Sequence, residues 1–292
     1  LGMMQAAVFI GNAIGPFFGG LAADGFGYRA SFRIGALLTA LGGLLVLLGT
    51  HDPFIPAARR SGDRSPGFRA IALLPGFLIS VAVLFGVRLC NSLANPSFPL
   101  IVSTLLKTPA QQDNLNSITG AIIAGAAVAA AGSAAILGYV GDRMGRRRVL
   151  IGCCLAACAA SAGHYFASTL GGLFAARLLF GFAVAGMLPA ANAMIHAVVD
   201  PRSIGKAYGL STSLSMLGTA VGPAVGGTLA MSCGLRIPFL ATGAAQLGLA
   251  GLILAFFRDP KPRRAGAAEP GQEAAPRSRP PGPHPAAEGP GP

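Results

Sequence analysis

Apolar runs of about 20 residues dominate this sequence and constrain its fold more than any other feature. Eight of them lie near residues 3–23, 32–50, 71–94, 117–138, 149–168, 170–195, 207–232 and 237–257. A helix needs about 20 apolar residues to cross the hydrocarbon core of a bilayer, and a helix satisfies all of its own backbone groups there. The runs therefore predict an all-α integral membrane protein.

The composition excludes most soluble classes of protein. The 292 residues are 53% hydrophobic and 11% charged, whereas a soluble domain carries about 25% charged residues. The net charge of +12 comes from short clusters between the apolar runs, so we expect no nucleic-acid partner. The five cysteines lie in apolar stretches without His or acidic residues at ligand spacing, which predicts neither a disulfide framework nor a metal site.

The Lys and Arg residues fall mainly on one side of the predicted bundle. Sixteen lie in segments 51–70, 139–148 and 196–206 and from residue 258 onward, and only four lie in the loops on the other side. Cytoplasmic loops carry the excess of Lys and Arg, so the side with sixteen is predicted to be cytoplasmic. Segment 51–70 becomes a central cytoplasmic loop, and the Pro-rich segment 258–292 a disordered cytoplasmic tail.

The first two apolar runs repeat in the last two. A shift of 207 residues leaves fifteen of the first 53 positions identical, and it aligns Gly15-Pro16 with Gly222-Pro223. Parallel half repeats are a known plan of transporters. Residues 1–50 are thus expected to be the last two helices of a first half, and residues 71–257 a six-helix second half. By this symmetry, we expect four further spans, about 136 residues, ahead of Leu1.

Segment 138–148 carries the clearest motif. It reads Gly-Tyr-Val-Gly-Asp-Arg-Met-Gly-Arg-Arg-Arg and resembles the G-x-L-x-D-R-x-G-R-[KR]-x loop signature of the major facilitator superfamily. The resemblance implies the major facilitator fold, with eight of twelve transmembrane helices in this chain. It also implies a loop that biases the inward-facing against the outward-facing state, although a positive anchor without a gating role is the alternative. The implied gating residues are Gly138, Asp142, Arg143, Gly145 and Arg146.

Segment 11–20 resembles the G-x-x-x-G-P-x-x-G-G signature on the fifth helix of drug:proton antiporters in that superfamily. Glycines four residues apart form a smooth stripe on which another helix packs closely, and proline permits a kink. The resemblance implies efflux of drug-like small molecules, coupled to protons, and no cofactor. Its two copies give the helix-packing residues Gly11, Gly15, Pro16, Gly19, Gly218, Gly222, Pro223 and Gly226.

A polar stripe in the run 71–94 is the candidate substrate surface. Arg88 lies deep in the run, and polar residues follow at i+3, i+4 and i+7, on one helix face. In the family that the sequence resembles, this helix lines the central cavity; an interhelical hydrogen-bond seam is the alternative. The run 170–195 adds weaker candidates. The set is Arg88, Asn91, Ser92, Asn95, Met187 and Asn192, and the helix is expected to break at Pro96 and Pro99.

Two further polar residues lie near predicted helix ends. Arg177 is about eight residues from the start of its run, so it either faces a cavity or a carbonyl partner or extends to the outer interface. His164 lies at the end of its run and is expected at the membrane interface.

The function expected from these features is secondary active efflux by alternating access in a bacterial inner membrane. Its partners would be the lipid bilayer, a small-molecule substrate and protons. No Ser/His/Asp, HExxH, Walker or dinucleotide motif occurs, so we expect no enzyme. Two alternatives stay open: an importer of a small anionic metabolite, favoured by Arg88, and a truncated fragment that transports nothing.

Overall fold

The computed structural model describes residues 2–49, 67–200 and 203–256, and all regular structure within them is helical. The helices belong to one compact unit, residues 1–259. The predicted tail 258–292 and most of the predicted central loop lie outside the described residues. The helices are α1 (Gly2–Phe26), α2 (Tyr28–Gly49), α3 (Phe68–Ala72), α4 (Pro75–Leu93), α5 (Ser97–Leu105), α6 (Pro109–Asp113), α7 (Leu115–Met144), α8 (Arg146–Phe166), α9 (Leu170–Val198), α10 (Ile204–Cys233) and α11 (Ile237–Phe256).

All eight predicted runs are helical, as α1, α2, α4, α7, α8, α9, α10 and α11. Among the described residues, seven spans are long and apolar enough to cross a membrane; α4 and α5 together form one of them, Gly76–Leu105, and α1 is not in this set. The predicted break at Pro96 is present: α4 ends at Leu93 and α5 begins at Ser97. Pro99, however, lies in the first turn of α5, where a missing N–H costs little, so the helix resumes after one turn.

Three glycines with positive φ join consecutive helices. They are Gly27 between α1 and α2, Gly145 between α7 and α8, and Gly234 between α10 and α11. Their φ values of 81°, 93° and 111° belong to a region that residues with a Cβ rarely enter. Gly27 and Gly234 are equivalent under the 207-residue shift, so the internal repeat extends from sequence to helix–helix junctions.

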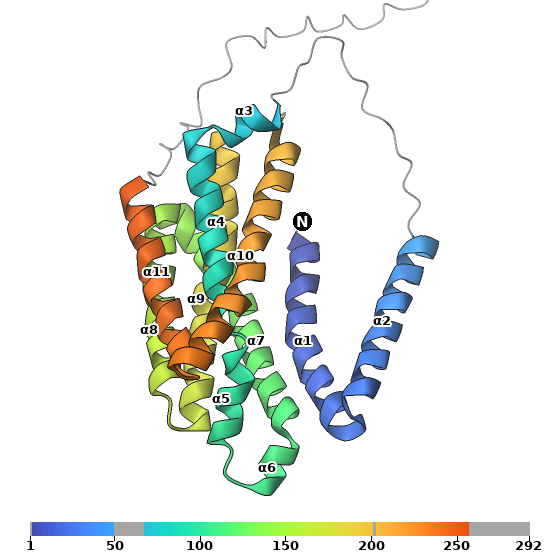
Figure 1. The fold of residues 1–292 in the computed structure, drawn as a ribbon. Helices are drawn as coiled ribbons and strands as arrows, with labels where there is room; N and C mark the ends of the chain where they lie inside the picture. The colour runs from blue at the N-terminus through green and yellow to red at the C-terminus, as the bar shows by residue number, and fades with distance from the viewer. Residues whose placement is uncertain (1, 50–66, 201–202, 257–292) are drawn as a thin grey trace, which may run out of the picture. The chain divides into compact units, whose positions relative to one another are not determined.

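The outward surface of the bundle is apolar. None of the described residues of α2 is buried, although Leu45, Leu47 and Leu48 are among its members. An apolar helix without protein cover suits a lipid environment, since the bilayer supplies the apolar contact. Figure 1 shows α1 between α2 and the rest of the bundle, in contact with α7.

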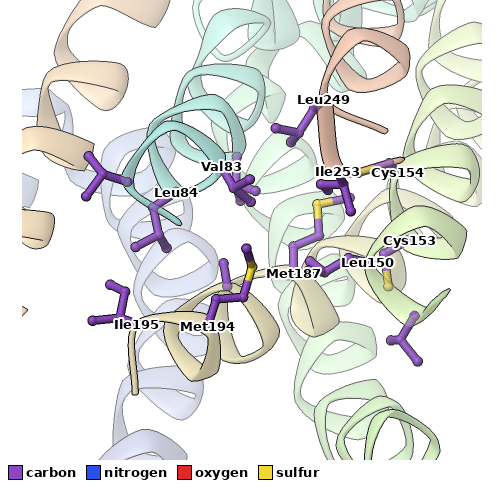
Figure 2. Close-up of a cluster of buried hydrophobic side chains, with 14 of the residues drawn as sticks. Val83, Leu84, Leu150, Cys153, Cys154, Met187, Met194, Ile195, Leu249 and Ile253 are labelled. Carbon is purple, nitrogen blue, oxygen red and sulfur yellow. The ribbon is translucent and has the colours of Figure 1, made fainter. Parts of the chain in front are cut away.

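The six helical spans after residue 67 pack around two apolar clusters. The larger lies between α4, α8, α9 and α11, and includes Leu84, Leu150, Met187 and Ile253 (Figure 2). The second lies at the other end of the bundle and includes Phe98, Ile101 and Phe239. Between these clusters the bundle interior carries the polar groups described next.

Candidate functional site

A polar cluster lies inside the six-span half, close to the second apolar cluster. A cavity of about 10 Å³ is bounded there by residues of α4, α8, α9 and α11, which is near the lower limit for one water molecule. Its polar lining consists of Asn91, Ser161, His164, Arg177 and Thr242. Four helices therefore meet at one small polar cavity.

His164 is buried in this cluster, with 1% of its surface exposed. It lies in the last turn of α8, near the helix end as predicted, and three aromatic rings enclose its side chain. The imidazole stacks on Phe239 with centroids 5.1 Å apart, and Phe98 and Phe180 approach edge-on at 6.0 Å. Its Nδ1 lies 2.7 Å from the carbonyl oxygen of Ala160, which leaves Nε2 buried without a hydrogen bond among the described residues.

Arg177 turns toward the same cluster. Its guanidinium carbon lies 4.4 Å from the centroid of Phe98 and 5.7 Å from that of Phe180. A guanidinium over an aromatic face is held by the ring quadrupole. No carboxylate pairs with Arg177 in the described part of the chain, so the aromatic rings are the observed partners of this charge. Of the two predicted placements, the structure favours the interior one.

The four residues of the predicted polar stripe do not share one surface: three lie on α4, and Asn95 follows the end of that helix. Asn91 lines the polar cavity. Ser92 is buried against α10, where its hydroxyl lies 3.2 Å from the carbonyl oxygen of Gly218, the seam that was the alternative interpretation, and 3.0 Å from that of Arg88 in its own helix. Arg88 is half-buried and its Nε finds no partner among the described residues, whereas Asn95 is exposed in the turn before α5.

The candidates on α9 do not form a shared surface with that stripe. Met187 is fully buried in the larger apolar cluster (Figure 2). Asn192 is half-buried, and its backbone carbonyl accepts a 3.4 Å hydrogen bond from the Tyr208 hydroxyl. Gln246 on α11 is a further buried polar residue, 0% exposed, with both amide atoms unpaired among the described residues.

The predicted gating loop is a junction of two helices. Gly138, Asp142 and Arg143 lie in the last turns of α7, and Arg146 begins α8. Gly145 alone makes the turn, and its φ of 93° explains why glycine stands there. A cavity of about 170 Å³ adjoins the junction, lined by Gly138, Arg146 and Pro189 among others. The side chain of Asp142 lies outside the part of the structure that is described.

The two copies of the helix-packing motif differ in what they contact. On α10, Gly218, Gly222 and Gly226 are buried against α4, and a Cβ atom at Gly226 would overlap the carbonyl of Leu93. Pro223 lies inside the same helix. On α1, the equivalent glycines Gly11, Gly15 and Gly19 meet no described atom within 4 Å of an added Cβ.

α1 instead contacts α7 through Gly20, the residue after Gly19. A Cβ at Gly20 would overlap the backbone of Asn116, and a Cβ at Gly120 would overlap the carbonyl of Pro16. Beside this close approach, the carboxylate of Asp24 accepts hydrogen bonds from the first turn of α7. Sequence reasoning missed Asp24; the available signal was that it is the one acidic residue in the first 50 positions.

Comparison with known proteins identifies the family. A family model described as the Major Facilitator Superfamily matches residues 81–286. The chain belongs to this superfamily. Its helices are accordingly those of a major facilitator fold, and the chain is a multi-pass membrane protein.

Relatives of this major facilitator chain are bacterial. It is 31% identical over 251 residues to the uncharacterized MFS-type transporter YuxJ of Bacillus subtilis, covering 83% of this chain and 62% of YuxJ. It is 28% identical to a multi-drug resistance efflux pump PmrA homolog of Lactococcus lactis, covering 83% of this chain and 59% of the relative. It is also 28% identical to the multidrug resistance protein MdtG of Enterobacter lignolyticus, with 85% and 59% covered. The major facilitator chain thus spans about 60% of the length of these relatives.

Proposed function

We propose that this chain takes part in proton-coupled efflux of drug-like small molecules by alternating access. The observation that carries the proposal is its similarity, over 83–85% of its length, to a protein named as a multi-drug resistance efflux pump homolog and to one named as a multidrug resistance protein. The glycine-proline motif on α1 and its repeat on α10 agree with an exporter of this kind. In this proposal, residues 1–50 complete a first half, residues 71–257 form the second half, and 51–70 connects them in the cytoplasm.

The candidate residues for substrate contact remain part of the proposal, although they do not form one continuous surface. Asn91, with Arg177 and His164, offers polar groups inside the second half, and Arg88 offers a half-buried cation. Ser92 acts in helix packing, because its hydroxyl is bonded to α10. Asp142, Arg143 and Arg146 at the α7–α8 junction would bias one facing state against the other.

The test is an accumulation assay in cells that lack their major efflux pumps. Cells express either the chain alone or the longest open reading frame that contains it, since the relatives are longer. Lipophilic cations, tetracyclines and quinolones are measured with and without a protonophore. Lower accumulation that the protonophore abolishes supports proton-driven efflux; unchanged accumulation with both products present in the membrane contradicts it.

A second candidate function is uptake of a small anionic metabolite. The guanidinium of Arg177, which has no carboxylate partner among the described residues, favours it, because an intramembrane cation without a counter-charge is costly and attracts an anionic partner. Uptake of radiolabelled organic anions in the same cells distinguishes this candidate from efflux. An Arg177→Gln variant that keeps anion uptake unchanged would contradict it.

A further inference from the structure

Asp24 forms the densest set of hydrogen bonds between α1 and the six-span half. It lies just beyond the apolar run 3–23, in the last turn of α1. Its Oδ2 accepts from the backbone N–H of Ser117 at 2.6 Å, and its Oδ1 accepts from the side-chain amide of Asn116 at 2.7 Å and from the Asn116 N–H at 3.3 Å. Tyr28 donates its hydroxyl to the Asn116 side-chain oxygen at 3.1 Å, which completes the network.

The acceptor fits the chemistry of the helix end that it meets. Asn116 and Ser117 lie in the first turn of α7, where the N–H groups have no acceptor within the helix. The N-terminal end also carries the positive pole of the helix dipole. The N-cap residue of α7, Asn114, makes no side-chain cap hydrogen bond. A carboxylate from another helix, 92 residues away in sequence, therefore supplies the acceptor that a cap residue would provide.

The Asp24 contact lies in the last turn of α1. Gly20 is buried against α7 near Asp24, and Gly120 of α7 packs on the backbone of Pro16 one turn earlier in α1. The Asp24 end carries the loops with few Lys and Arg residues, which is the outer side by the charge rule. In Figure 1 this is the end where α1 approaches α7, next to the α1–α2 junction.

We propose that Asp24 is a gating residue, which locks the outer ends of α1 and α7 together and must release the first turn of α7 when the outer side opens. The proposal rests on the proposed transport function, because α1 and α7 belong to different halves of the repeat. Asp24 contacts no substrate in this role; it positions one half against the other. A charge-assisted contact suits a lock because water replaces its hydrogen bonds once the outer side opens.

The experiment measures the distance between the two outer ends in the full chain. Nitroxide labels are attached at Phe26→Cys on α1 and Ala110→Cys on α6, both at exposed positions. Cys158 and Cys233, the two cysteines that are not buried, are replaced by Ala. The reference protein should give mainly short distances by pulsed electron resonance. In Asp24→Ala the ratio of long to short distances should rise by about tenfold, because charged hydrogen bonds are lost.

Graded variants guard against misfolding. Asp24→Asn keeps one acceptor oxygen and should give an intermediate shift, and Asn116→Ala, which leaves both backbone donors, a smaller one. Asp113→Ala, which removes an exposed carboxylate from α6, should leave the distances unchanged. If folded Asp24→Ala and Asp24→Asn both keep the reference distances, the lock is refuted. If the protein exports substrate but the Asp24 variants leave the label distances unchanged, the lock alone is refuted. If the Asp24 variants change the distances but the protein exports nothing, the proposed function is refuted and the lock stands.

Discussion

At the scale of single residues, the interior of the second half holds charge without an acidic partner. Arg177 stacks on Phe98, and His164 fills the space beside Phe239. Neither residue has an ion pair within the described ranges. A half-buried cation without a carboxylate partner stabilises a fold weakly at best, so Arg177 is a candidate for the proposed transport function.

Replacing Arg177 separates these two roles. Arg177→Lys places a compact, strongly hydrated ammonium where a flat guanidinium stacked, and should lower the free energy of unfolding by about 1–2 kcal/mol. Arg177→Met removes the charge and should cost less than the Lys variant, while abolishing transport. Thermal unfolding in detergent and the accumulation assay measure the two effects. A Met variant less stable than the Lys variant would contradict this account.

Asp24 gives a prediction for pH. Burial acts to raise the pKa of its carboxyl, but hydrogen bonds from Ser117 and Asn116 outweigh that effect and hold the pKa below its ordinary value of 3.8. The ionised form is the one that binds α7, so the contact is fully present above the ordinary pKa and is lost as the pH falls through the lowered one.

The distance between labels at Phe26→Cys and Ala110→Cys should therefore stay constant from about pH 8 to about pH 5, and lengthen only in strongly acidic buffer. Pulsed distance measurements in frozen samples across this range check it. Lengthening between about pH 7 and about pH 5 would show that another group controls the outer contact.

At the scale of helices, glycine stripes decide which helices come close. α10 lies against α4 because Gly218, Gly222 and Gly226 present no Cβ, which lets the Ser92 hydroxyl reach the Gly218 carbonyl. In lipid, such close packing and interhelical hydrogen bonds hold helices together in place of a hydrophobic driving force.

Adjacent glycines on α10 provide a matched test. Gly226→Ala would overlap the Leu93 carbonyl and should lower the free energy of unfolding by about 1–3 kcal/mol. Gly227→Ala meets nothing within 4 Å and should leave stability unchanged or raise it by up to about 1 kcal/mol, since alanine favours a helix. Chemical unfolding in mixed micelles measures both variants. If they lose the same free energy of unfolding, the glycine stripe does not stabilise the protein through the contact between α4 and α10.

At the scale of the whole molecule, α1 meets the six spans after residue 67 along α7. The two copies of the glycine motif pack differently. The copy on α10 packs against α4, whereas on α1 the neighbouring Gly20 packs against α7. Gly20, Gly120 and the carboxylate of Asp24 take part in this approach of α1 to α7.

Widening this approach should shift the conformation without unfolding the protein. Gly120→Ala would overlap the Pro16 carbonyl. It should increase the long-distance fraction for the Phe26/Ala110 label pair several-fold, which corresponds to a shift of about 1 kcal/mol between the two conformations. Gly132→Ala, on the same helix and with nothing near its added Cβ, serves as the control. A Gly120→Ala protein that unfolds at lower temperature with unchanged distances would assign the site to stability instead.

The sequence by itself determined the helical spans, the break before Pro96 and the repeat. Bilayer thickness fixes the length of a span, and the backbone must satisfy its own hydrogen bonds in lipid, so these features are written in local composition. The family could also be predicted from a local motif, since segment 138–148 carries the residues of the loop signature at the same spacing.

Only the tertiary structure decided which way each helix faces. A helix that is apolar on all sides has no polar pattern that marks its buried face. The polar residues near Arg88 therefore contact different neighbours, and the side chain of His164 lies among aromatic rings. Asp24 became a candidate lock only because Ser117, 93 residues later, brings an open helix end to its carboxylate. Such partners are set by packing between distant segments, which no local pattern records.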